Sequence, residues 1–261
     1  MSSNWHAACF RFLYPATLGQ PTETVMHKTA LLLIACLVGL SACDDDLDTD
    51  LDGTDTEIEA TVNFGMNVRD FVTLEPVSGL EIEYGDQAFV TTSDGGLAIP
   101  VPANGPVAIN STNSDYPDTY WHFASAEDDF SIGTFMVSRQ TAGQIMGALG
   151  QTLDPSKGIL VVAIFGPESG FVPGATVDLD AEYSAAIVAD SGSQIGFSVG
   201  NKTLEGSSAW VVFLNVEAGD ATPTVTLADQ ALDCGVFPSG ADAGPIAIRG
   251  DSLNHFHYQC N

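Results

Sequence analysis

The feature that most constrains the fold is a series of short β-rich runs, each bounded by residues that favour turns. From residue 61 onward, apolar and polar residues alternate in these runs, and Gly, Pro, Asn, Asp and Ser separate them. Alternation with a period of two is typical of strands that bury one face, and this spacing favours antiparallel sandwiches over parallel α/β units. The runs cover residues 61–64, 80–84, 88–91, 107–109, 159–165, 175–179, 210–214 and 224–227.

One stretch has a helical pattern instead. Between Ser138 and Leu149, the residues Ile145, Met146 and Leu149 fall on one stripe, and Ser138 is a candidate N-cap. Nearby glycines make this a weak helix unless packing stabilises it. We therefore expect residues 138–156 to form a short connecting helix and a linker.

An internal repeat links the two β-rich parts of the chain. The segment PVSGLEI (76–82) parallels VPGATV (172–177), and the turn TSDG (92–95) parallels ADSG (189–192). At a larger offset, IPVPANG (99–105) parallels LNVEAG (214–219). A proline and glycine turn that opens a strand, followed by an Asp-Gly turn that closes a hairpin, is physically reasonable in each copy. The second copy is expected to carry an extra hairpin around residues 193–208.

At these turn motifs the chain resembles the carboxypeptidase regulatory-like domains, a family of transthyretin-like (prealbumin-like) β-sandwiches. The resemblance covers most of residues 61–261 and implies an all-β protein with one or two antiparallel sandwich domains. Two copies would occupy residues 61–137 and 157–261, and one larger sandwich is the alternative.

The N-terminal part contains a segment typical of export signals. A short basic stretch at 26–29 precedes an apolar run of eleven residues at 30–40, which ends in LSAC at 40–43. A spanning helix needs about 20 apolar residues, whereas a signal-peptide core needs about 7 to 15. The end of the run resembles the lipobox of bacterial lipoproteins, which implies a lipid on Cys43 and removal of residues 1–42. The alternative is an ordinary secretory signal. We expect translation to begin at Met26, and an extended signal is the alternative to that start.

An acidic segment follows Cys43. Residues 44–59 contain nine Asp or Glu side chains and no basic residue. Asp48, Asp50, Asp52, Gly53 and Glu59 match the written pattern of a calcium loop, but the flanks lack the amphipathic helices that such a loop needs. We expect residues 43–60 to form a disordered tether that is extended by its own repulsion, with weak calcium association left open.

Charge and cysteine content agree with an exported protein. The chain has 34 acidic and 7 basic residues, a net charge of −27, which disfavours nucleic acid and anionic lipid as partners. Removal of residues 1–42 and acylation of Cys43 would leave Cys234 and Cys260, a natural disulfide pair in an oxidising compartment. Two free thiols are the alternative.

The sequence offers little catalytic chemistry. It has no nucleophile elbow, phosphate loop or HExxH motif. His255 and His257 would lie on one face of a strand, a spacing that can hold a metal. Their His-x-His pattern resembles that of the intradiol dioxygenases, which share a prealbumin-like sandwich and bind iron with two further tyrosines. The alternative is an ordinary final strand without metal, and we expect no cofactor.

The best binding candidates are aromatic. In the segment YPDTYWHF (116–123), Tyr116, Tyr120 and Trp121 could present rings to a sugar or a peptide, although Trp121 is equally well placed for the core of a half-buried strand. The sequence therefore favours a non-enzymatic protein of the cell envelope that is anchored in the membrane by lipid and binds a glycan or an envelope protein. A metal-dependent enzyme built on His255 and His257 is the alternative.

Overall fold

The computed structural model describes residues 60–167, 170, 172–189, 196–204, 210–227, 232–242 and 244–261. The expected signal peptide, Cys43 and the acidic tether up to residue 59 lie outside the described residues. The segment from Asp55 to Asn261 forms one compact unit. Within the described part of the chain, no helix is both long and apolar enough to cross a bilayer.

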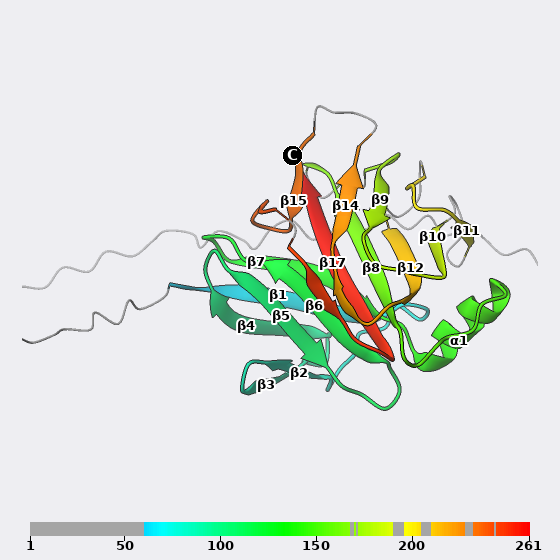
Figure 1. The fold of residues 1–261 in the computed structure, drawn as a ribbon. Coiled ribbons are helices and arrows are strands. Elements are labelled where there is room, and N and C mark those ends of the chain that lie inside the picture. Colours follow the sequence, from blue (N-terminus) through cyan, green and yellow to red (C-terminus); the bar gives the residue numbers. More distant parts are fainter. Residues whose placement is uncertain are drawn as a thin grey trace, which may run out of the picture. The chain divides into compact units, whose positions relative to one another are not determined.

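The N-terminal sandwich consists of two facing layers (Figure 1). One layer has the strand order β4-β1-β7, and the other has the order β3-β2-β5-β6. Alternate residues of these strands are buried, so the inner faces form one hydrophobic cluster that includes Phe64, Ile109 and Trp121. The strands are β1 (Thr61–Asp70), β2 (Glu81–Tyr84), β3 (Gln87–Val90), β4 (Gly96–Pro102), β5 (Pro106–Ser111), β6 (Asp118–Ala124) and β7 (Phe130–Met136).

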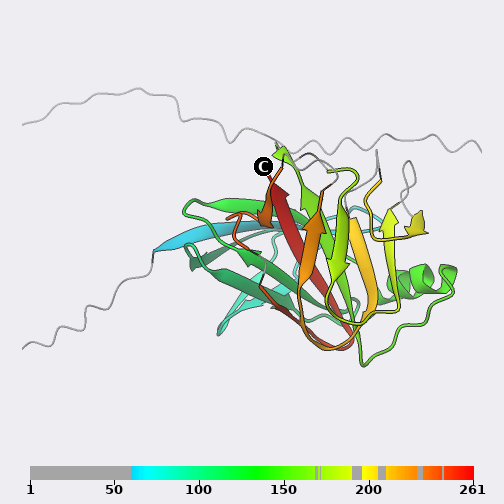
Figure 2. The same cartoon turned by 45° about the horizontal axis from the view of Figure 1, so that its top comes forward.

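The C-terminal sandwich has the same two-layer organisation. Its main layer has the order β11-β10-β12-β8-β17, and the strand pairs β9–β14 and β13–β16 cover that layer (Figure 2). A second hydrophobic cluster, which includes Leu160, Phe213 and Phe256, fills the space between the layers. The strands are β8 (Gly158–Phe165), β9 (Thr176–Leu179), β10 (Ala185–Ala189), β11 (Phe197–Val199), β12 (Trp210–Val216), β13 (Gly219–Ala221), β14 (Pro223–Thr226), β15 (Cys234–Val236), β16 (Ile246–Ile248) and β17 (Ser252–Cys260).

The helix α1 (Arg139–Ala148) connects the two sandwiches, as the sequence predicts. The Ser138 hydroxyl accepts a hydrogen bond from the Thr141 backbone N–H at 3.2 Å, which confirms Ser138 as the N-cap. Met146 is buried against Ile187 and Leu214 of the C-terminal sandwich. This packing stabilises a helix whose composition is unfavourable.

A continuous sheet joins the two sandwiches. Strand β17 lies between β8 and β6 and runs parallel to both. Strands β1 and β7 are parallel as well, so the sheets are mixed rather than purely antiparallel. Parallel neighbours require long crossover connections, which local turn signals in the sequence do not reveal. The strands nevertheless fall within the expected segments 61–137 and 157–261, whose independent folding stays a prediction.

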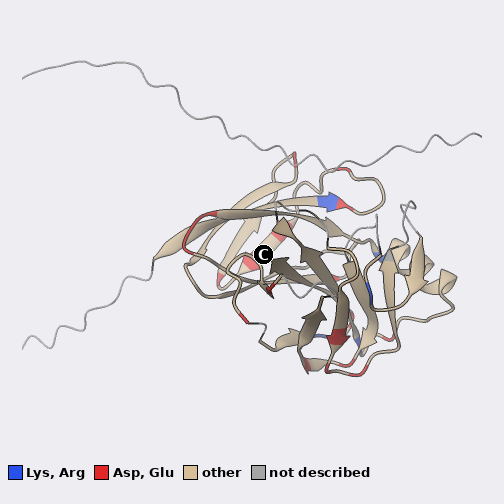
Figure 3. Ribbon diagram, turned by 90° about the horizontal axis from the view of Figure 1, so that it is seen from above, with Lys and Arg blue, Asp and Glu red and all other residues tan. Residues whose placement is uncertain are grey.

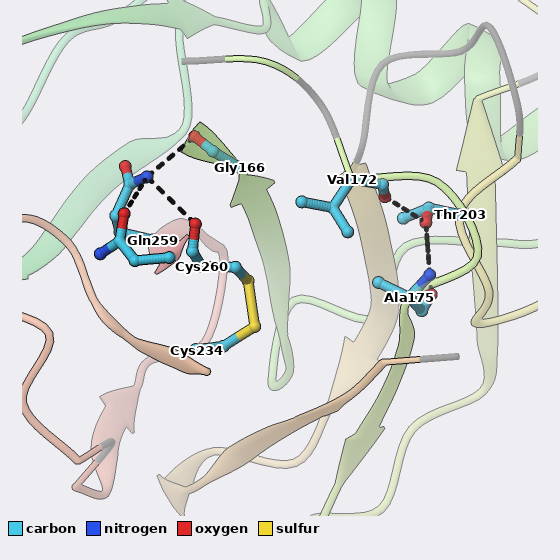
Figure 4. Close-up of a disulfide and its surroundings, with 8 residues drawn as sticks. Gly166, Val172, Ala175, Thr203, Cys234, Gln259 and Cys260 are labelled. Carbon is cyan, nitrogen blue, oxygen red and sulfur yellow. Dashed lines mark hydrogen bonds between the residues drawn. A yellow bond between two sulfur atoms is a disulfide. The ribbon is translucent and has the colours of Figure 1, made fainter. Parts of the chain in front are cut away.

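The two sandwiches share a pattern of side-chain hydrogen bonds at the first match of the internal repeat. The Thr91 hydroxyl donates to Val77 O at 2.7 Å and accepts from Leu80 N at 2.9 Å. The Thr203 hydroxyl makes the equivalent bonds, to Val172 O at 2.8 Å and from Ala175 N at 2.9 Å (Figure 4). The strand orders β4-β1-β7 and β12-β8-β17 also match in direction. In each set the middle strand is antiparallel to the first strand and parallel to the last.

The second match of the repeat, between the turns at 92–95 and 189–192, falls mostly on residues 190–192, which lie outside the described residues. The described residue that makes the same hydrogen bonds as Thr91 is Thr203. The extra hairpin is β10–β11, and its first strand starts at Ala185, earlier than expected. It replaces the two-residue turn between β2 and β3 of the first copy, and β10 extends the main sheet next to β12.

The two buried threonines should be matched determinants of stability. Thr203→Val removes the hydroxyl and leaves the Ala175 N–H without its acceptor, so we expect a loss of about 2 kcal/mol in the free energy of unfolding. Thr91→Val should cost a similar amount. Urea unfolding of both variants measures this, with Thr224→Val on an exposed strand position as the control. Unchanged midpoints for Thr91→Val and Thr203→Val would contradict the structural role.

Candidate binding surface at the junction of the two sandwiches

The alternation of β6 separates the predicted aromatic residues onto two faces. Trp121 lies on the inner face with none of its surface exposed, and its indole N–H donates to the Thr134 hydroxyl at 2.9 Å. Phe123 is buried on the same face, whereas Tyr120 and His122 lie on the outer face and are half-buried. Trp121 is therefore part of the core and presents no ring to a ligand in this structure.

Tyr116 also has a structural environment. It packs against the N-terminal hydrophobic cluster, and its hydroxyl donates to the Asp70 carboxylate at 3.1 Å. Burial, together with the nearby negative charge of Asp70, raises the pKa of Tyr116 to about 12. Of the three aromatic residues that the sequence singles out, Tyr120 is the one placed on the outer sheet face.

Polar side chains surround Tyr120 on that outer face. Strand register places Asn110 of β5 on one side of Tyr120 and Asn254 of β17 on the other. Asn110 donates through its side-chain amide to the Glu83 carboxylate at 2.8 Å, which continues the polar row onto β2. The next row pairs His122 with the small exposed residue Ala108. We call Glu83, Asn110, Tyr120, His122 and Arg249 the outer-face site.

Arg249 comes from the other sandwich. It follows β16 in the connection to β17, and its guanidinium carbon lies 4.8 Å from the centre of the Tyr120 ring. A guanidinium at this distance from an aromatic face is attracted by the ring electrons, with a free energy of about 1 kcal/mol. The outer-face site thus takes side chains from both sandwiches, and binding sites commonly form at such junctions.

His255 and His257 lie deep in the junction on the inner face of β17. The His255 ring stacks on Trp121 with ring centres 5.8 Å apart, and the His257 ring packs on Phe123 at 5.4 Å. Both side chains are buried, and neither His255 Nε2 nor His257 Nδ1 has a hydrogen-bond partner. Desolvation by burial lowers the pKa of His255 to about 3 and lowers the pKa of His257 well below its ordinary value. Both rings are therefore neutral in the folded protein near pH 7.

The structure does not bring further ligands to this histidine pair. The ring centres of His255 and His257 are 6.2 Å apart, and the described residues include no group of three or more His, Cys, Asp or Glu side chains that could hold a metal ion. Tyr258, the tyrosine nearest in sequence, lies on the opposite face of β17 and donates its hydroxyl to Pro223 O at 2.5 Å. The aromatic rings that pack on His255 and His257 are those of Trp121, Phe123 and Phe165.

The predicted disulfide between Cys234 and Cys260 is confirmed (Figure 4). The two cysteines are directly opposed on the antiparallel strands β15 and β17, with Cα atoms 4.0 Å apart. Mutual backbone hydrogen bonds between Asp233 and Asn261 flank them, which makes the cysteines a non-hydrogen-bonded pair with closely spaced side chains. The bond attaches the end of β17 to the neighbouring strand.

Sequence reasoning missed the partners of Tyr120. Arg249 and Glu83 are far from Tyr120 in the sequence, and the strand pairing that brings them together has no local signal. Asn110 comes from β5, the strand that directly precedes β6. His122 could have been predicted from the sequence. Strict alternation along residues 118–124 places His122 on the same face as Tyr120 once Trp121 is assigned to the core.

Comparison with known proteins gives no family for this chain. No family model matches it, and no curated protein matches it. Similar solved structures include the Bacillus anthracis TIE protein (13% identity, TM-score 0.23, 77% of this chain and 34% of that one) and a streptococcal ancillary pilin (13%, 0.24, 78% and 63%). Another is the shaft pilin SpaA from Lactobacillus rhamnosus GG (11%, 0.22, 78% and 98%). The chain spans less than two thirds of the first two proteins. Superpositions this poor define neither fold nor function, which therefore rest on the residues of the chain itself.

Proposed function

We propose that this chain is a non-catalytic binding protein of the cell envelope that holds a carbohydrate at the outer-face site. The observation that carries the proposal is the placement of Tyr120, half-buried on an outer sheet face and contacted by Arg249 from the second sandwich. An aromatic ring fixed in this way offers a flat apolar surface at little further cost in conformational entropy.

The neighbouring side chains fit the chemistry of a sugar. The C–H face of a pyranose ring packs on an aromatic ring, and its hydroxyl groups need donors and acceptors at the rim. Asn110 and Glu83 provide an amide and a carboxylate on the row that contains Tyr120. Ala108, opposite His122, is small and leaves the sheet open to a ligand.

The location of the protein is proposed from the sequence. The apolar run at 30–40 and the LSAC ending at Cys43 support export and a lipid anchor, and residues 44–59 would hold the sandwiches away from the bilayer. Membrane fractionation of the full chain tests this: wild type should sediment with membranes, and Cys43→Ser should appear in the soluble fraction. A membrane-bound Cys43→Ser protein would contradict the anchor.

The binding proposal is tested on glycan and protein arrays with residues 60–261. We expect selective retention on glycans and a loss of about five- to tenfold in affinity for Tyr120→Ala, since stacking on an aromatic ring contributes about 1–1.5 kcal/mol. Tyr183→Ala is the matched control, because Tyr183 is a partly exposed tyrosine of the other sandwich, away from β6. Absence of glycan binding, binding to proteins only, or equal effects of the two variants would each overturn the proposal.

A further inference from the structure

We infer that the ligand of the outer-face site is an acidic sugar, and that Arg249 binds its single carboxylate next to the Tyr120 ring. This inference rests on the proposed function and specifies the chemistry of its ligand. It follows from the distribution of positive charge and from the position of the Arg249 guanidinium beside Tyr120.

Positive charge is scarce in this protein, and much of it lies at one corner. The chain has 7 basic residues against 34 acidic ones, and Figure 3 shows how few Lys and Arg positions there are. Three basic residues, Arg139, Lys157 and Arg249, surround the start of β17. Arg139 is paired with the Asp251 carboxylate at 3.0 Å, and the Asp251 backbone N–H donates to Lys157 O at 3.0 Å.

Arg249 differs from the other two in its partners. Lys157 forms an ion pair with Glu217 at 2.6 Å, so both Lys157 and Arg139 are neutralised by carboxylates. Within the described residues, Arg249 has no carboxylate partner and contacts the Tyr120 ring instead. The positive charge of Arg249 also contributes, after burial, to the lowered pKa of His122. The site therefore has a positive charge that no carboxylate of the described residues pairs with.

The geometry of Arg249 suits a carboxylate. The guanidinium is planar and has five N–H donors directed outward in its plane, and these match the two oxygens of a carboxylate. The contact with the Tyr120 ring does not consume the N–H donors of Arg249 as hydrogen bonds to a carboxylate would, and no salt bridge joins Arg249 to another described residue. A pyranose ring on the exposed part of Tyr120 would thus bring a carboxylate on the sugar to the edge of Arg249.

Two polar side chains beside Tyr120 have their partners within the protein. Asn254 is the strand neighbour of Tyr120 and is fully buried, and its side-chain amide donates to Ile159 O and to the Ser252 hydroxyl. A side-chain hydrogen bond joins Asn254 to His122 on the same face. The polar side chains left for the hydroxyl groups of a sugar are therefore those of Asn110 and Glu83.

The surrounding charge limits the ligand to one negative group at this position. Glu83 and Glu81 lie on the same outer face of the sheet, and the net charge of the chain is −27. This field repels polyphosphates and nucleic acids, whereas one carboxylate can be matched by one arginine. The two glutamates remain available as acceptors for sugar hydroxyls.

The test uses a glycan array with residues 60–261. The probes end in glucuronic, galacturonic or N-acetylneuraminic acid, and each has a neutral counterpart in which the carboxylate is reduced to an alcohol. We expect at least one acidic probe to bind about tenfold or more tightly than its neutral counterpart. Arg249→Gln should remove this preference, and Lys202→Gln, an exposed cation in the C-terminal sandwich, should retain it. Thermal unfolding confirms that both variants are folded.

The outcomes separate the two proposals. If neutral and acidic probes bind equally and Tyr120→Ala weakens both, the acidic-sugar inference is overturned and the proposed carbohydrate binding stands. If Arg249→Gln retains the preference for acidic probes, the assignment of Arg249 is wrong. If no probe and no other glycan binds, the proposed function fails, and the inference fails with it.

Discussion

Lowering the pH from 7 to 5 should reduce the free energy of unfolding by about 2 kcal/mol through His255, and His257 should add to this loss in the same direction. Both histidines are fully buried among aromatic rings, and burial lowers the pKa of His255 to about 3 and moves the pKa of His257 in the same direction. In the unfolded chain, each ring takes up a proton near pH 6.5. Between these two pKa values the unfolded state binds more protons, so stability falls as the pH falls.

The effect should be measured by urea unfolding at several pH values between 7 and 4. His255→Leu and His257→Leu remove the titrating groups, so each variant should show a shallower loss of stability in acid than wild type. The carboxylates of this acidic chain also titrate towards the lower end of the range, and comparison at equal pH separates their contribution. Parallel pH profiles for wild type and both variants would contradict the prediction.

The position of the histidines determines which part should open first in acid. His255 and His257 are on β17, and their rings contact Trp121 and Phe123 on β6 of the other sandwich. Protonation therefore penalises the β6–β17 contact directly. Hydrogen exchange at pH 5 should show earlier loss of protection in β6 and β17 than in β1, which is hydrogen-bonded to β4 and β7.

Removal of the disulfide should destabilise the protein by about 3 kcal/mol, the value expected for closing a loop of this size in the unfolded chain. Cys234 and Cys260 are 26 residues apart, and the loop between them contains β16 and most of β17. Without the bond, the end of β17 is held by its strand pairing and by the hydrogen bonds of the Tyr258 and Gln259 side chains. The loss should therefore appear in the stability of the sandwich junction as well as in global unfolding.

The measurement compares urea unfolding of wild type with that of the Cys234→Ala/Cys260→Ala double variant, which leaves no free thiol at either position. Wild type in reductant should match the double variant. Equal midpoints for the oxidised protein and the double variant would show that the crosslink contributes nothing. If the reduced wild type is less stable than the oxidised protein but the double variant is not, the loss of stability comes from the free thiols and not from the missing crosslink.

Local features of the sequence were predictable because their causes are local. Alternation gave most strands, the N-cap Ser138 gave the start of α1, and exclusion of the other cysteines left Cys234 and Cys260 as a pair. Pairing between distant segments was not predictable, because no residue of β17 specifies β6 as its neighbour. Arg249 therefore had no visible connection with Tyr120, and the candidate site was assigned to residues adjacent in sequence.

The two faces of β6 explain why Tyr120 is a candidate binding residue in the structure and Trp121 is not, although the sequence named both. Trp121 and Tyr120 are neighbours in sequence, yet one fills the core and the other lies on the outer face. Hydrophobicity does not separate them, since both are large aromatic residues. The choice is made by register: Trp121 is opposite the buried Ile109, whereas Tyr120 is opposite the half-buried Asn110.

The insertion of β17 between β6 and β8 has a consequence for biosynthesis. Both neighbours precede β17 in the chain, so each is translated with an open backbone edge. Open edges of this kind pair readily with foreign strands and promote aggregation. A nascent chain that stalls before β17 would expose two such edges at once, which makes it a natural client for chaperones and proteases.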